Sequence, residues 1–170
     1  MYVYDITTGM RILGIDPGIA RVGWAIIETT KPRLTTISYG CIETDKKDTS
    51  EVRLLQIHKA ILLLCKRFRP DCMSVEELFF AANAKTAISV GQSRGVILLT
   101  AAEARIPVVS YTPLAVKRTI AGYGNADKKQ VERMVVQILK LREGPKLDDT
   151  ADALAIAMTH AYSYKMKQII

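Results

Sequence analysis

The sequence predicts an α/β fold in which helices flank a five-stranded mixed sheet. Three β-branched or apolar runs follow one another with short links near the start of the chain, which predicts neighbouring strands. Two further short apolar runs then alternate with long segments of helical periodicity, which predicts crossovers within the same sheet. The chain has 170 residues, of which 49% are hydrophobic, and this suits one ordinary domain with a buried core.

The first strand is predicted over Arg11–Asp16, an apolar run that ends in an acid. Pro17-Gly18 follows, and it stops the strand because Pro cannot donate to a ladder and Gly tolerates turn angles. Asp16 is therefore held at the end of a rigid element. A single Asp beside a turn can simply accept hydrogen bonds from its own backbone, so a role in chemistry requires partner carboxylates elsewhere in the chain.

The next elements follow in order. Residues rich in Ile, Thr and aromatic types predict strands over 23–28 and 34–42, with a polar turn between them. Apolar residues at helical spacing predict a helix over 51–68, which Arg69-Pro70 ends. A fourth strand over 71–76 also closes with an acid, Glu76.

The second half of the chain predicts a long helix, a fifth strand and three more helices. Their ranges are 84–104 for the long helix, 107–111 for the strand, and 114–121, 126–141 and 148–165 for the last helices. Asp127 stands near the positive N-terminus of its helix, where an acid is favourable. We expect residues 10–170 to form a single domain and residues 1–9 to be an N-terminal extension of unknown role.

The charge balance favours a polyanionic partner. Lys and Arg number 24 against 17 Asp and Glu, which gives a net charge of +7. Nucleic acid is the first candidate partner and an anionic membrane surface is the second. A merely soluble basic protein is the alternative. Cys41, Cys65 and Cys72 form no CxxC motif, so we expect buried free thiols in a reducing cytoplasm. No apolar run approaches the roughly 18 residues of a membrane span, so no membrane partner is expected.

Acidic residues recur at the ends of predicted elements. Asp16 ends the first strand, Glu76 ends the fourth, and Asp148, Asp149 and Asp152 open the last helix. Clustered carboxylates repel one another unless a cation neutralises them, and oxygen ligands favour Mg²⁺ or Mn²⁺. Two such ions about 4 Å apart can support in-line phosphoryl displacement. Spacing alone leaves open whether these ends converge, and Asp148 can equally serve as an N-cap.

Several motifs resemble the RuvC family of crossover junction endodeoxyribonucleases, which are Holliday junction resolvases. They are GIDPG with Asp16, VEELFF with Glu76, and DDTADALAIAMTHA with Asp149 and Asp152. NAKTAISVGQSRG and KRTIAGYGNADKKQV occur in the same order, so the resemblance covers nearly the whole chain from Met10. It implies a ribonuclease H-like fold, and it implies that Asp16, Glu76, Asp149 and Asp152 are the metal-binding catalytic acids.

The resemblance also implies partners and cofactors. It implies Mg²⁺, with two ions per site and Mn²⁺ as a substitute, together with a homodimer that cuts a four-way DNA junction symmetrically. A dimer contact would lie on the helix that contains Arg94, to which no role is assigned. RuvA and RuvB would be the branch-migration partners.

Basic residues concentrate between Lys117 and Arg142, where seven stand against two acids. Phosphate contacts from such residues position a duplex, so we predict DNA contacts from Lys117, Lys128, Lys129 and Arg133. The resemblance matches Lys117 and Lys128 to basic residues near the active site, and it matches Phe79 to an aromatic side chain that stacks on an unpaired base. The alternatives are a solvated helix face for the basic residues and a core position for Phe79.

The expected function is metal-dependent resolution of four-way DNA junctions in recombination and repair. One rival is another ribonuclease H-like nuclease that acts on RNA or on hybrid. A second is a non-catalytic junction-binding protein, although binding alone gains nothing from four clustered acids. An actin-like ATPase would need phosphate loops and a second domain, for which the chain leaves little room. His160, two turns past Asp152, is open as an additional metal neighbour.

Overall fold

The computed structural model describes residues 9–30, 33–77 and 84–167. Within these ranges, five strands form a single sheet in the order β3-β2-β1-β4-β5. The strands are β1 (Met10–Asp16), β2 (Arg21–Thr30), β3 (Arg33–Glu43), β4 (Cys72–Glu76) and β5 (Val108–Tyr111). β1, β2 and β3 pair antiparallel, whereas β4 lies parallel to both β1 and β5. The predicted five-stranded mixed sheet is confirmed.

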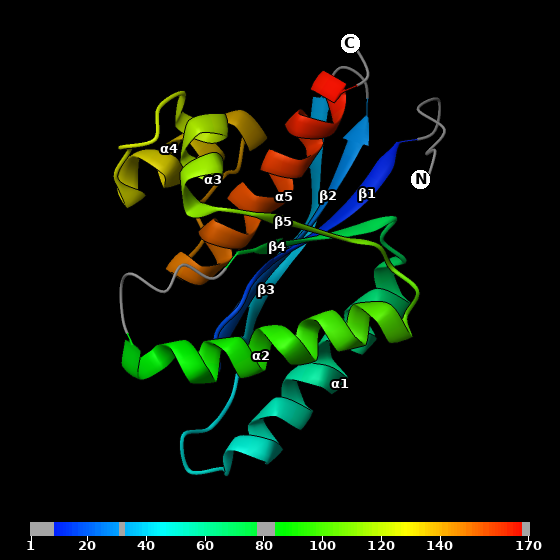
Figure 1. Cartoon of the computed structure of the whole chain (residues 1–170). Coiled ribbons are helices and arrows are strands. Elements are labelled where there is room, and N and C mark those ends of the chain that lie inside the picture. Colours follow the sequence, from blue (N-terminus) through cyan, green and yellow to red (C-terminus); the bar gives the residue numbers. More distant parts are fainter. Residues whose placement is uncertain (1–8, 31–32, 78–83, 168–170) are drawn as a thin grey trace.

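Helices cover both faces of this sheet (Figure 1). Two of them, α1 and α2, lie on one face, and α3, α4 and α5 lie on the other. Their bounds are α1 (Ser50–Phe68), α2 (Ala84–Glu103), α3 (Pro113–Ala121), α4 (Lys128–Leu139) and α5 (Asp148–Lys167). The sequence therefore predicted the type and order of every described element.

Boundaries differ from the predictions where local bonds decide them. The second and third strands extend to 21–30 and 33–43, because their pairing continues from Arg21↔Glu43 to Thr30↔Arg33 and satisfies the backbone of the polar ends. The helix predicted over 126–141 is shorter. It begins after Asp127, whose side chain forms a capping box with Gln130, and it ends at Lys140 in the left-handed conformation (φ 52°).

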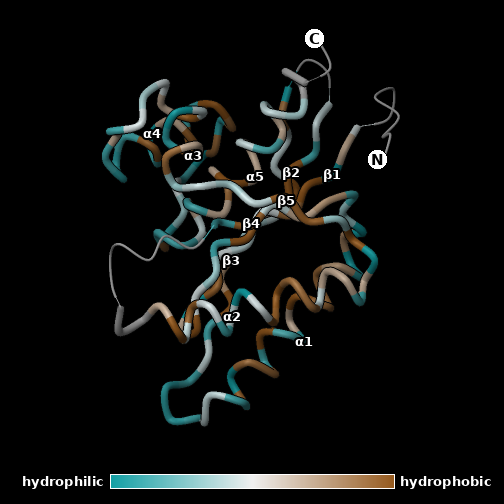
Figure 2. The backbone as a smooth tube through the Cα atoms, in the orientation of Figure 1, coloured by the Kyte–Doolittle hydropathy of each residue, from teal (hydrophilic) through white to brown (hydrophobic). Residues whose placement is uncertain are grey.

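The sheet separates two apolar cores. Leu13, Ile15 and Val75 face α1 and α2, where they pack with Ile57 and Ile97. Alternate residues of the same strands face α5, since successive strand side chains point to opposite faces. Those on the α5 side include Ile12 and Ile27, which pack with Leu154, Ile156 and Met158. Figure 2 shows the hydrophobic strands between the two helical layers, and burial of each large side chain stabilises the fold by about 1.5–3 kcal/mol.

Two glycines let α5 lie unusually close to the sheet. A Cβ at Gly14 in β1 would meet the carbonyl of Ala153 and the side chain of Ala157. A Cβ at Gly23 in β2 would meet the carbonyl of Asp149. The backbone of α5 therefore rests on the two strands at positions where any other residue would hold it away.

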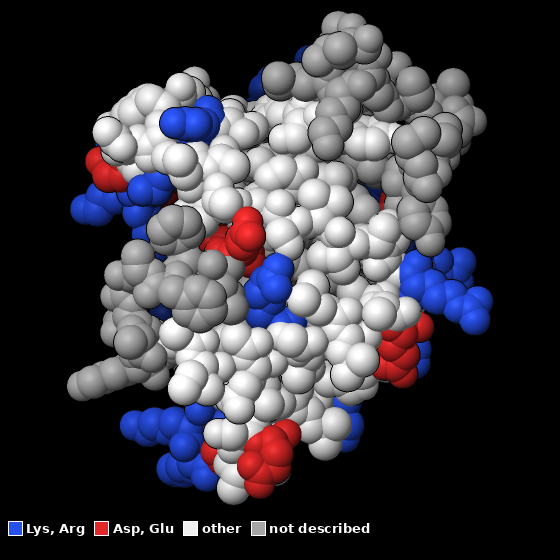
Figure 3. All heavy atoms as spheres, in the orientation of Figure 1, with Lys and Arg blue, Asp and Glu red and all other residues white. Residues whose placement is uncertain are grey.

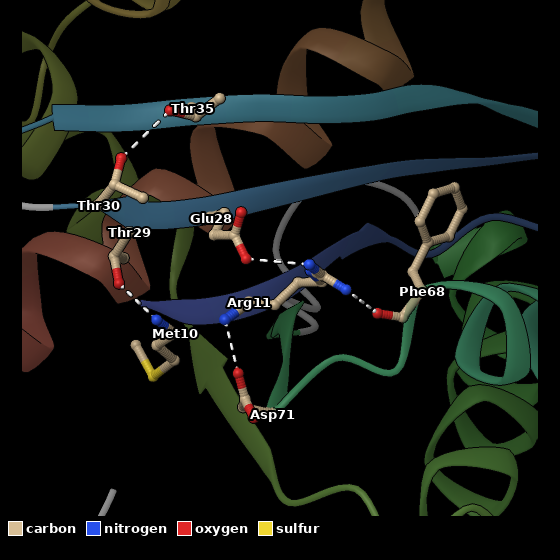
Figure 4. Close-up of polar contacts among 8 residues, drawn as sticks. All are labelled: Met10, Arg11, Glu28, Thr29, Thr30, Thr35, Phe68 and Asp71. Carbon is tan, nitrogen blue, oxygen red and sulfur yellow. Dashed lines mark hydrogen bonds and ion pairs between the residues drawn. The ribbon is translucent and has the colours of Figure 1, made fainter. Parts of the chain in front are cut away.

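Arg11 joins the beginning of β1 to three neighbouring segments (Figure 4). Its guanidinium forms an ion pair with Glu28 of β2 (3.0 Å) and donates a hydrogen bond to the Phe68 carbonyl at the end of α1 (2.8 Å). Its backbone N–H donates to the Asp71 carboxylate just before β4 (2.7 Å). These contacts hold the end of the sheet at which β1 begins, and the acids lie at the opposite end of the strands.

The three cysteines are free thiols. Cys65 and Cys72 are buried, and burial raises their pKa values to about 11 and about 12. Cys41 was predicted to be buried but is half-buried, because it lies in β3 at the edge of the sheet. Among the helices of the described ranges, none combines the length and apolar character required to cross a bilayer.

Candidate active site

Asp16 and Glu76 lie at adjacent strand ends. β1 and β4 are parallel neighbours whose last paired residues are Ile15 and Val75. The next residue in each strand is the acid, and the carboxyl ends of parallel strands reach the same edge of a sheet. Apolar pairing along the two strands thus delivers both carboxylates to one place.

The first turn of α5 brings the other two acids to the same edge. Gly23 stands directly opposite Asp16 in the β1–β2 ladder, and it is the glycine on which the backbone of Asp149 rests. Asp152 follows three residues later, so it projects from the same side of the helix. Asp16, Glu76, Asp149 and Asp152 together are called the acid cluster below.

The pKa values show that the acid cluster shares one electrostatic environment. Burial raises the pKa of Asp16 well above its usual value, and the charges of Glu76, Asp152 and Asp149 raise it further. Burial and the charge of Asp152 raise the pKa of Glu76 to about 7. The pKa of Asp152 is also raised, first by burial, despite the opposing effect of Lys128. The carboxylates are close enough to destabilise one another in their charged forms.

Two cations partly neutralise the acid cluster. Arg21 Nε lies 3.1 Å from Asp149 Oδ2. Lys128 Nζ lies 2.9 Å from Asp152 Oδ2 and 3.5 Å from the exposed Asp148. Burial alone would lower the pKa of Lys128, but its contacts with Asp152 and Asp148 outweigh burial and raise it. Asp148 shares Lys128 with Asp152 and its charge raises the pKa of Asp152, whereas Asp149 also raises the pKa of Asp16.

A cavity of about 240 Å³ opens beside the acid cluster. Glu76 and Asp152 line it from the acidic side, and Lys117 and Lys128 line it from α3 and α4. Its remaining walls are apolar, from Pro113, Val116, Val131 and Ile156. Carboxylates and ammonium groups therefore face the same small space, an arrangement suited to a phosphate held together with metal ions.

The donor set of the acid cluster fits a hard divalent cation, because it consists of carboxylate oxygens alone. Asp149 Oδ2 supports this, since it is buried and its close approach to Arg21 does not have hydrogen-bond geometry. In the ranges that the structure describes, no three His, Cys, Asp or Glu side chains are placed to hold one ion as they lie. The carboxylates of Asp149 and Asp152 are turned toward Arg21 and Lys128 instead.

The predicted DNA-contacting residues fall into separate groups. Lys117 and Lys128 line the cavity, whereas Lys129 and Arg133 are exposed on α4. In the view of Figure 3, Lys and Arg side chains stand out over the α3–α4 region. Phe79 lies outside the described residues.

His160 is buried and is not a member of the acid cluster. Its Nδ1 lies 2.8 Å from the hydroxyl of Tyr111, in a hydrogen bond between α5 and β5. The ring also packs near Tyr164. The structure therefore gives His160 a place in the core between these elements.

Sequence reasoning missed Arg21 and the two glycines beneath α5. Arg21 is the first residue of β2, two positions before Gly23, which pairs with Asp16. Its proximity to Asp149 depends on the packing of α5, for which the sequence holds no local signal. Gly23 carried one usable signal, because a glycine inside a strand often marks close approach of another backbone.

Comparisons with known proteins identify the family that this chain resembles in sequence and fold. The family model described as crossover junction endodeoxyribonuclease RuvC matches residues 12–160. The proteins of that name from Syntrophomonas wolfei and Halothermothrix orenii are 48% and 51% identical to this chain, over 95% and 94% of it and 94% and 96% of their own lengths. The structure of Thermus thermophilus RuvC in complex with Holliday junction substrate superposes with a TM-score of 0.88 at 38% identity, covering 93% of this chain and 96% of that one. Sequence, fold and the order of the acid-bearing elements lead to one conclusion: the chain belongs to the RuvC family of crossover junction endodeoxyribonucleases and has its ribonuclease H-like fold.

Proposed function

We propose that this chain is a structure-selective endonuclease that resolves four-way DNA junctions by metal-dependent phosphodiester hydrolysis during homologous recombination and DNA repair. The acid cluster carries the proposal, because carboxylates from two strand ends and one helix start gather beside a cavity that Lys117 and Lys128 also line. The T. thermophilus relative in complex with Holliday junction substrate supports the choice of substrate.

The metal chemistry is proposed residue by residue. Nucleases of the RuvC family depend on metal ions, and Asp16, Glu76, Asp149 and Asp152 would hold them here. Two Mg²⁺ ions per site, replaceable by Mn²⁺, match a donor set of carboxylates. When bound, such ions stabilise charge on the phosphate and activate the attacking water.

The side chains of this chain supply the remaining functions. Asp16 is affected by the charges of the other three acids, so its carboxylate would hold metal together with theirs. Lys117 lines the cavity and can bind a phosphate oxygen. Lys128 neutralises Asp152 in the free protein, and its ammonium would be available to the DNA backbone if Asp152 held a metal ion.

Further DNA contacts are proposed around this site. Lys129 and Arg133 are exposed on α4, next in sequence to Lys128, where they can reach phosphates of a junction arm. Phe79 would stack on a base at the crossover, as the family resemblance implies. Phosphate contacts of this kind position the duplex, whereas stacking selects an unpaired base.

A homodimer is proposed for paired cutting, because a two-fold dimer matches a two-fold junction. α2 exposes Ile88 (75%) and Leu99 (65%), and α1 exposes Leu63 (65%) on the same side of the sheet. Large exposed apolar side chains on neighbouring helices suit a subunit contact. The family resemblance supports RuvA and RuvB as partners, a single nuclease domain over 10–170 and a location with the DNA in the cytoplasm.

The test is cleavage of a synthetic four-way junction by the purified chain, with and without Mg²⁺. Linear duplex and RNA–DNA hybrid of the same sequence serve as matched substrates. Paired, Mg²⁺-dependent nicks confined to the junction are expected. Preferential cutting of the hybrid would keep the fold and the acid cluster but replace the substrate, and binding without cutting in either Mg²⁺ or Mn²⁺ would contradict an enzymatic role.

A further inference from the structure

The middle of α2 is bonded to both strand ends that carry acids. Ser93 is fully buried and its hydroxyl donates to the Gly18 carbonyl (2.9 Å), in the turn that follows Asp16. The next residue, Arg94, donates from Nε to the Glu76 carbonyl (3.2 Å). From these contacts we propose that Ser93 and Arg94 are positioning residues that set the separation of Asp16 and Glu76.

The contacts act where β1 and β4 no longer pair with each other. The β1–β4 ladder ends at Ile15 and Val75, one residue before each acid. Asp16 pairs with Gly23 of β2 and Glu76 pairs with Tyr111 of β5, and α2 is bonded to both strand ends. Two adjacent residues of one helix have a fixed separation, because helical backbone geometry is regular. The pair Ser93-Arg94 therefore spans the two strand ends with little freedom.

Arg94 also forms a hydrogen bond with β5, the strand next to β4. Its Nη2 donates to the Ser110 hydroxyl in β5 (2.8 Å), and Tyr111, the next residue, pairs with Glu76 in the β4–β5 ladder. Nε and Nη2 of Arg94 thus both donate to acceptors in the strands of the same protein. A planar, multidentate cation holds two acceptors in fixed relation, whereas a lysine ammonium on a flexible stem does not.

The turn after Asp16 is tight enough to transmit this restraint. A Cβ at Gly18 would meet the carbonyl of Arg21, so the backbone at Gly18 is pressed against the beginning of β2. Holding the Gly18 carbonyl from α2 therefore limits movement of the Asp16 backbone as well. Metal ligands generally depend on hydrogen bonds from surrounding residues for their orientation. Asp16 and Glu76 would depend on Ser93 and Arg94 in this way.

The inference rests on the proposed function, because it assigns these residues to the same metal-dependent cleavage. The experiment compares Arg94→Ala, Arg94→Lys and Ser93→Ala with wild type and with Lys59→Ala. Lys59 is an exposed basic residue on the neighbouring helix α1, so it controls for loss of a positive charge. Each protein is tested for junction affinity in Ca²⁺, for single-turnover cleavage at saturating protein, and for the Mg²⁺ concentration that gives half the maximal rate.

Arg94→Ala and Ser93→Ala should lower the saturating rate by about 10–100-fold and raise the Mg²⁺ midpoint, with junction affinity nearly unchanged. Arg94→Lys should not restore the rate, since it retains the charge but not the paired bonds. An unchanged rate and midpoint in both alanine variants would overturn the inference. So would weaker junction binding with a normal saturating rate, which would make Arg94 a DNA contact. Ser93→Ala keeps the test decisive if the Arg94 variants fail to fold, and failure of wild type to cut junctions would identify an error in the proposed function instead.

Discussion

Asp16 in β1 and Gly23 in β2 stand directly opposite each other in the antiparallel ladder, and the backbone of Asp149 rests on that glycine. An acid at a strand end and an acid at a helix start are therefore neighbours because the residue between them has no side chain. The close packing of α5 on β2 therefore determines whether Asp149 belongs to the acid cluster.

Gly23→Ala should reduce both stability and cleavage. The added Cβ would meet the Asp149 carbonyl, and relief of that overlap requires the first turn of α5 to move away from Asp16. Overpacking of this kind costs about 1–3 kcal/mol in the free energy of unfolding, which urea denaturation can measure. Gly144→Ala is the matched control, because a Cβ there meets only ordinary van der Waals neighbours. Equal junction cleavage by the two variants would show that α5 does not need to lie so close.

Asp16→Asn should abolish junction cleavage and preserve junction binding. The substitution removes a charge from the centre of the acid cluster without removing a contact from α3 or α4. Loss of metal-assisted charge stabilisation is worth several kcal/mol, which corresponds to roughly 100–1000-fold in rate. Single-turnover cleavage and a binding titration measure the two properties separately. Retained cleavage would contradict the assignment of the acid cluster as the metal site.

The metal-free protein should lose stability as pH rises from about 5 to 8. The pKa of Glu76 is raised from 4.5 to about 7, so between these values the folded state holds a proton that the unfolded state has released. The contribution of the protonated Glu76 to the free energy of unfolding is complete below the pKa of the unfolded state. It disappears as the pH passes through the pKa of the folded state. The pKa of Asp16 is raised in the same direction.

Glu76→Gln should flatten this dependence and stabilise the metal-free protein at pH 8 by on the order of 2 kcal/mol. Denaturation in EDTA at several pH values provides the measurement. Glu77→Gln is the control, since Glu77 is exposed beside it. An identical pH dependence in the Glu76 and Glu77 variants would mean that the pKa of Glu76 is not raised in the folded protein.

Lys128→Ala should weaken junction binding and reduce the salt dependence. One lost phosphate contact lowers the slope of log K against log salt by about 1. Lys47→Ala removes an equally exposed charge from the loop before α1 and should leave the slope unchanged. If the Lys128 slope equals that of wild type, the ammonium serves Asp148 and Asp152 alone.

Arg11→Ala should destabilise the fold without changing the saturating cleavage rate. Arg11 bonds Glu28 and the Phe68 carbonyl at the sheet edge opposite the acid cluster. Because the side chains are partly solvated, the expected loss is about 1–2 kcal/mol. Thermal or urea unfolding measures it, and a strongly reduced cleavage rate in the folded variant would contradict the separation of the two edges.

The sequence predicted the sheet, the helices and the acids at the ends of the strands, because these features depend on short-range patterns. An apolar run that closes with Asp16 before Pro17-Gly18, and another that closes with Glu76, are visible in one dimension. Helix ends were predicted less well, since the cap at Asp127 and the left-handed residue Lys140 depend on individual hydrogen bonds.

The contacts of the site were less accessible to sequence reasoning. Lys128 was expected to meet DNA, and the structure adds its ion pairs with Asp148 and Asp152. Ser93 and Arg94 lie in the motif NAKTAISVGQSRG, from which the sequence predicts no role for either residue. Their hydrogen bonds to Gly18 and Glu76 join segments that are far apart in the chain, and no local pattern encodes such pairs.

The position of α5 on Gly14 and Gly23 also affects how the chain matures during synthesis. Domains fold as units while the ribosome adds about 5–20 residues per second. In this chain the α5-facing side of β1 is covered only after α5, the last described helix, has been synthesised. The same helix carries Asp149 and Asp152. A nascent or prematurely terminated polypeptide that lacks α5 therefore has an uncovered apolar sheet face and only two of the four members of the acid cluster. The proposed nuclease site is therefore incomplete until α5 has packed against β1 and β2.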